Sequence, residues 1–132
     1  MTRRDRPLSL AQAQRETDFP FPASAQDIHY ATYQDFMAPF EFILRFDAPP
    51  ADCEATIPRA LAWHEQRHKG SSAYKTLQVT AVALPDSSYL HPVAWWDGAT
   101  IQEGAFAGED SSHKPTIWVD SRLGRFYYRS TD

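Results

Sequence analysis

Apolar and polar residues alternate along two parts of the chain, and this alternation predicts two β-hairpins. In the segment 40–46, FEFILRF, large apolar side chains take every second position, as in a strand with one strongly buried face. The preceding segment 27–34, DIHYATYQ, is separated from it by a proline-containing turn, so the two segments predict a hairpin. The segments 116–120, TIWVD, and 125–130, RFYYRS, flank a turn around Gly124 and predict a second hairpin.

Between residues 51 and 68 the spacing of buried positions changes to three and four, which predicts the main helix. Pro58 lies inside this segment, where a proline costs about 3 kcal/mol unless it falls in the first turn of a helix. We therefore expect a short turn followed by a helix that begins at Ile57. One face of this helix carries Cys53, Ile57, Leu61, His64 and His68.

The remaining segments complete a small α+β architecture. Residues 77–84, LQVTAVAL, predict a central strand covered on both faces, residues 91–98 an aromatic strand or loop, and residues 98–114 a long surface loop. Runs of antiparallel strands with one helix predict a single α+β domain at residues 19–132, with an antiparallel sheet of four to five strands packed against one main helix. Residues 1–18 are mostly polar and predict a flexible or weakly helical N-terminal arm.

Composition and charge narrow the classes of function. The chain has 132 residues, 42% of them apolar, which suits one packed core. A formal net charge of -4 disfavours binding to nucleic acid or to an anionic membrane surface. No segment approaches the ~18 consecutive apolar residues of a membrane span. The single cysteine, Cys53, cannot form an internal disulfide, so we take the cytoplasm as the default location, with export after removal of a signal segment as the alternative.

The motif HEQRH, residues 64–68, has the spacing of a zinc hydrolase helix. His64 and His68 would lie one above the other on the helix and hold zinc, and Glu65 would act as the general base. Three features oppose this interpretation. Arg67 places a positive charge beside the second histidine, the helix is expected to end there, and no third ligand is specified, since Tyr74 occupies the position of the next histidine in longer motifs. Two histidines at the end of a core helix explain the same spacing, so zinc and catalysis are the less favoured interpretation.

Aromatic residues in the second half of the chain favour a binding function. The expected site consists of Trp95, Trp96, Asp97, Glu103, Phe106 and Tyr127. Tryptophan and tyrosine combine a large apolar area with a hydrogen-bonding group, which is typical of surfaces that recognise other proteins.

The resulting hypothesis is a small acidic non-enzymatic module, without a cofactor, that binds a protein partner through an aromatic sheet face or the loop 95–110. Bacterial proteins that neutralise toxins have this general profile. It predicts an exposed tryptophan at 95 or 96 and an acidic patch formed by Glu103, Glu109, Asp110 and Asp120. The alternatives are the compact zinc-dependent hydrolase and a small-ligand carrier that uses a cavity between the sheet and the helix.

Overall fold

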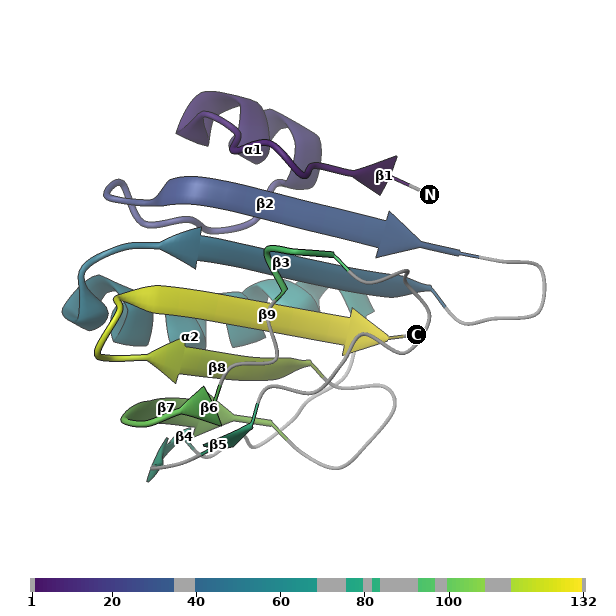
Figure 1. Cartoon of the computed structure of the whole chain (residues 1–132). Coiled ribbons are helices and arrows are strands. Elements are labelled where there is room, and N and C mark those ends of the chain that lie inside the picture. The colour runs from purple at the N-terminus through teal and green to yellow at the C-terminus, as the bar shows by residue number, and fades with distance from the viewer. Residues whose placement is uncertain are drawn as a thin grey trace.

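The computed structural model describes residues 2–34, 40–68, 76–79, 82–83, 93–96, 100–108 and 115–131. A seven-stranded sheet with the order β1-β2-β3-β9-β8-β7-β4 forms the centre of the fold (Figure 1), and its neighbouring strands are antiparallel. Its strands are β1 (Thr2–Arg3), β2 (Gln26–Tyr33), β3 (Glu41–Asp47), β4 (Thr76–Val79), β7 (Gly104–Ala107), β8 (Thr116–Asp120) and β9 (Arg125–Thr131). The α+β class and both predicted hairpins, β2–β3 and β8–β9, are confirmed.

The sheet is larger than the predicted four to five strands, because short segments with weak sequence patterns join its two ends. β1 extends it beside β2, while β7 and β4 extend it beside β8. A separate two-stranded sheet pairs β5 (Val82–Ala83) with β6 (Thr100–Ile101). The prediction of one central strand across residues 77–84 is therefore wrong: β4 lies at the end of the described strand order, and β5 pairs elsewhere.

The prediction of a surface loop across residues 98–114 is also wrong for its described part. β6 and β7 lie within it, and Ile101, Ala105 and Ala107 are buried. Small residues made this segment resemble a loop, but they allow close packing between strands. At Gly104 an added Cβ would lie 1.7 Å from the carbonyl oxygen of Val119 on β8, so only glycine fits there.

Helix α2 (Pro50–His68) runs through Pro58 without a break, so the predicted start at Ile57 is wrong. The carbonyl of Pro49 accepts from the N–H groups of Asp52 (2.9 Å) and Cys53 (3.0 Å), which begins the helix about two turns earlier than predicted. Pro58 is exposed, while Cys53 and Ile57 on the opposite face are buried. Burial of this face on both sides of the proline outweighs its local cost of about 3 kcal/mol.

The N-terminal segment contains a second helix, α1 (Leu10–Thr17), beside β2. The side chain of Ser9 caps its N-terminus by accepting from the N–H of Gln12, and Asp18 ends it in the left-handed conformation, with φ 59°. Ala13 of this helix is fully buried. In the part of the chain described above, neither helix has the length and apolar character needed to cross a membrane.

The two faces of the sheet carry two separate cores. Helix α2 covers the rear face in Figure 1, where Phe42, Leu44 and Phe46 of β3 pack with the helix and with Phe19. On the opposite face, residues 93–96 pack against β3, β8 and β9. β3 is therefore buried on both faces, which corrects the prediction of a single buried face: its alternate positions include buried Glu41 and Arg45. Glu41 Oε1 lies 3.5 Å from Nε of Arg129, which supplies an opposite charge.

Candidate functional site

The histidine of the HEQRH motif that the structure describes is a core residue. His64 is 4% exposed, and its Nδ1 lies 2.9 Å from the hydroxyl oxygen of Tyr128 on β9. The side chain of His68 lies outside the described residues, and Glu65 is half-buried. Among the described residues, no group of three histidine, cysteine or carboxylate side chains could hold a metal ion. His64 therefore contributes to the packing between α2 and β9.

The predicted aromatic binding residues are brought together, but inside the protein. Trp95 is 5% exposed and Trp96 is 6% exposed, so neither ring offers an open platform. The ring of Trp96 meets that of Tyr127 at 5.5 Å and that of Trp118 at 6.0 Å, both in edge-to-face geometry, and half-buried Phe106 lies 6.1 Å from Trp118. These rings form the core of the sheet face opposite α2.

The predicted acidic patch does not assemble from the residues that are described. Glu103 is exposed, but Asp120 is 7% exposed, and its Oδ1 accepts from the N–H groups of Arg122 (3.0 Å) and Leu123 (3.2 Å) in the β8–β9 turn. Asp97, Glu109 and Asp110 lie outside the described residues. The carboxylate of Asp120 thus shapes the β8–β9 turn.

A buried polar cluster links the N-terminal segment to the sheet. Arg45 donates to Asp27 (2.7 Å) and to the carbonyl of Trp95 (2.8 Å). His29 Nε2 lies 3.0 Å from the carboxylate of Asp27, and His29 Nδ1 lies 3.0 Å from the carbonyl oxygen of Arg4. The His29 and Trp95 rings stack at 5.4 Å. Although burial raises the pKa of Asp27, the hydrogen bond from His29 and the charge of Arg45 lower it overall. These hydrogen bonds join β2 and β3 to the N-terminal segment and to residues 93–96, which indicates a structural role.

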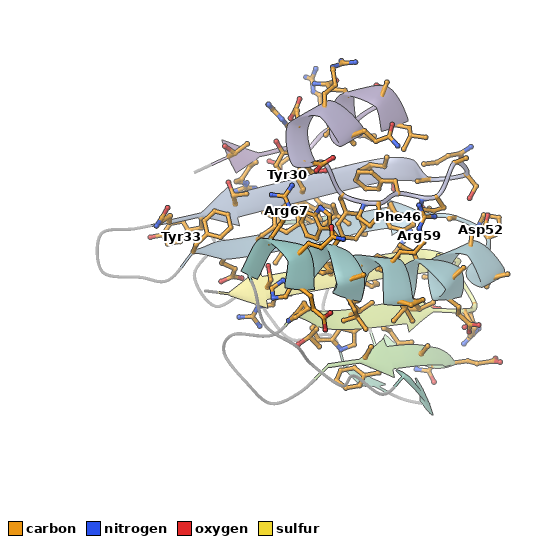
Figure 2. All side chains as sticks on the ribbon, turned by 180° about the vertical axis from the view of Figure 1, so that it is seen from behind. Tyr30, Tyr33, Phe46, Asp52, Arg59 and Arg67 are labelled. Carbon is orange, nitrogen blue, oxygen red and sulfur yellow. The ribbon has the colours of Figure 1, made fainter. Side chains whose placement is uncertain are left out.

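A cavity of about 360 Å3 lies on the other face of the sheet, between the two helices. We call it the aromatic pocket, and its lining consists of Glu16, Thr17, Tyr30, Thr32, Phe40, Phe42, Trp63, Arg67 and Ser130. Figure 2 shows Tyr30 on β2 and Arg67 near the C-terminal end of α2 on this side of the molecule. Four of the nine lining residues are aromatic and the other five are polar or charged, so the pocket offers ring surfaces together with hydrogen-bonding groups, as ligand sites do.

Among the described residues, two other hollows are larger but more open to solvent. One, of about 540 Å3, lies around Pro49 and Leu123 at the β8–β9 turn, and the other, of about 490 Å3, lies between Arg3 and Trp95. Neither has more than one aromatic ring in its lining. Since burial of a ligand between apolar walls supplies most of its binding free energy, the aromatic pocket is the better candidate despite its smaller volume.

Hydrogen bonds fix one wall of the aromatic pocket. Glu16 Oε1 accepts from the Tyr30 hydroxyl (2.7 Å) and from Nε of Arg4 (2.8 Å), and its Oε2 accepts from the Gln12 side chain (2.8 Å). The bonds from Tyr30, Gln12 and Arg4 lower the pKa of Glu16 to about 2. Burial and the bond to this carboxylate raise the pKa of Tyr30. The Glu16 carboxylate therefore joins α1 to β2 in its charged form at neutral pH.

The opposite wall is formed by the last turns of α2. The guanidinium of Arg67 lies over the ring of Trp63 with its central carbon 4.5 Å from the ring centroid, and Arg67 Nη2 donates to exposed Asp18 at 3.2 Å. Trp63 in turn packs against Phe19 at 5.1 Å and Phe42 at 6.2 Å, which holds the ring between α2 and the sheet.

Part of this pocket was accessible to sequence reasoning and was missed. Trp63 and Arg67 lie four positions apart and must share a helix face, and Tyr30 and Thr32 must share a strand face. The zinc motif that begins one residue after Trp63 drew the interpretation to His64 instead. No local sequence pattern indicates that these two faces pack beside α1.

No protein-family model, curated protein or solved structure matches this chain.

Proposed function

We propose that this protein is a non-enzymatic binding module that holds the apolar part of a small ligand in the aromatic pocket. The observation that carries the proposal is the cavity of about 360 Å3 walled by Tyr30, Phe40, Phe42 and Trp63. An apolar cavity of about 150 Å3 is enough to bind benzene, so this one has room for a two-ring compound or a short branched chain.

The polar groups of the pocket suit binding better than acid–base catalysis. A general base works best when its pKa lies near the working pH, whereas the pKa of Glu16 is about 2. Cys53 lies in the core at 0% exposure, and burial raises the pKa of its thiol to about 12. These two groups are thus poorly suited to act as base and nucleophile. The small-ligand carrier, an alternative from the sequence, receives this support, whereas protein recognition through residues 95–110 stays a prediction.

Titration with indole, an uncharged two-ring probe, tests the proposal by nuclear magnetic resonance. We expect saturable shifts in the signals of Tyr30 and Trp63, because stacked rings change each other's local magnetic field. A Thr32→Phe variant should lose them, since Thr32 is half-buried in the pocket wall and a phenyl ring there would fill the cavity. Phenylalanine is favoured in strands, so the backbone should tolerate the change.

Thr116→Phe is the matched control. Thr116 is also a half-buried strand threonine, but it alternates with Ile117 and Val119 of the α2-facing core and so faces the other side of the sheet. This variant should bind indole like the wild type. Shifts that persist in Thr32→Phe, or that centre on Trp95 and Trp96, would contradict a site in the aromatic pocket.

A further inference from the structure

Hydrogen-bond donors and acceptors are unequally available around the aromatic pocket. Its carboxylate, Glu16, already accepts three hydrogen bonds, from Arg4, Gln12 and Tyr30. A carboxylate has about four lone-pair sites, so little acceptor capacity remains for a ligand. The positive charge of Arg4 also offsets the charge of Glu16 at 2.8 Å. A ligand with a cationic group would therefore compete with these donors for the carboxylate of Glu16.

Arg67 presents the opposite situation. The guanidinium of Arg67 has five N–H donors. Among the described residues, its hydrogen-bond partner is the carboxylate of Asp18, which accepts from Nη2 at 3.2 Å. Asp18 keeps 85% of its side-chain exposure and Arg67 keeps 45%, and an ion pair so exposed to water is weak and easily exchanged. Stacking on Trp63 at 4.5 Å leaves the edge of the guanidinium, which carries the donors, available to a ligand.

We infer that the aromatic pocket selects ligands with a carboxylate attached to an apolar ring system, with Arg67 binding the carboxylate in competition with Asp18. This inference rests on the proposed function and adds the chemical class of the ligand. The rings would lie among Tyr30, Phe40, Phe42 and Trp63, and the two parallel N–H groups at one edge of the guanidinium match the spacing of two carboxylate oxygens. The C-terminal end of α2 carries partial negative charge, which disfavours an anion, but the full charge of Arg67 lies closer to the carboxylate.

Two isosteric probes separate charge from ring binding: 2-naphthoate, which is an anion at pH 7, and 2-naphthamide, which is neutral. We expect the wild-type chain to bind 2-naphthoate at least tenfold more tightly in calorimetric titrations at low ionic strength. The preference should decrease as salt is added, because the guanidinium is partly exposed. Thr32→Phe should bind neither probe.

Arg67→Gln should bind the two probes with equal affinity, because it removes the charge and the paired donors and leaves the rings in place. Arg59→Gln is the control: Arg59 is exposed on the same helix but lies toward its N-terminal end in Figure 2, outside the pocket, and its loss should leave the preference intact. A circular dichroism spectrum verifies that each variant is folded.

The outcomes distinguish the two proposals. Equal binding of the probes by the wild type, or a preference that survives in Arg67→Gln, overturns the inference of a carboxylate ligand while the pocket stays a binding site. Failure of both probes and of indole to bind overturns the proposed function together with the inference. A preference that is lost in Arg67→Gln and retained in Arg59→Gln supports both.

Discussion

Replacing Glu16 by glutamine should destabilise the protein at neutral pH and have little effect in strong acid. The Glu16 carboxylate joins α1 to β2 through Tyr30 and to the N-terminal segment through Arg4. Its pKa falls from an ordinary value of 4.5 to about 2 because Tyr30, Gln12 and Arg4 donate hydrogen bonds to the charged form. Glutamine keeps the shape of the side chain but carries no charge, so the substitution removes the charge-assisted part of these bonds.

The size of the effect follows from the pKa shift. A shift from 4.5 to about 2 would correspond to at most about 3 kcal/mol of folding free energy. The Glu16 side chain is 21% exposed and its partner Arg4 is 42% exposed, so water screens the interaction. We therefore expect a loss of about 1–2 kcal/mol at pH 7, which lowers the melting temperature by about 4–8 °C in a chain of this size.

The loss of stability caused by Glu16→Gln should be larger at neutral pH than in acid. Because the folded-state pKa is depressed, the stabilisation is complete above about pH 4.5 and disappears as the pH falls toward 2. Denaturant unfolding of wild type and Glu16→Gln at several pH values measures the difference, and Glu103→Gln, at an exposed carboxylate, controls for the change in net charge. A destabilisation that is the same at pH 7 and pH 2.5 would refute the assignment to the charge of Glu16.

Three further predictions concern buried groups. Gly104→Ala should cost more than about 3 kcal/mol in denaturant unfolding, because its Cβ would lie 1.7 Å from the Val119 carbonyl oxygen; an unchanged unfolding midpoint would contradict this. Cys53, whose pKa burial raises to about 12, should resist iodoacetamide at pH 8 in the folded protein and react fully in denaturant, so rapid labelling of the folded chain would count against the buried position. Arg45→Met should cost about 2–4 kcal/mol in the same unfolding assay, because the Trp95 carbonyl loses a donor at 2.8 Å; a loss under about 0.5 kcal/mol would show that the bond contributes little.

The elements that have a local physical cause were predictable from the order of residues. The alternation of apolar and polar residues from 40 to 46 indicates the two faces of a strand. The spacing of Cys53, Ile57 and His64 indicates one face of a helix. Both are properties of neighbouring residues, so the hairpins, the helix and the buried cysteine follow from the chain alone. The limits of the helix did not, because the cost of Pro58 is local whereas the burial that outweighs it comes from the sheet.

The positions of the aromatic residues, in contrast, depend on contacts between distant parts of the chain. The pairing of β3 with β9 joins residues more than eighty positions apart in the chain, such as Leu44 and Tyr128, and no local pattern specifies it. Trp95 and Trp96, which were predicted as binding residues, are buried against one face of the resulting sheet. The aromatic pocket lies on the other face, where Arg67 of α2 contacts Asp18 at the end of α1. A tryptophan in a short aromatic segment has the same sequence signature whether it is core or surface. Whether such a tryptophan is buried depends on which distant strand packs against it. The burial of Trp95 and Trp96 leaves the aromatic pocket on the other face of the sheet as the candidate site.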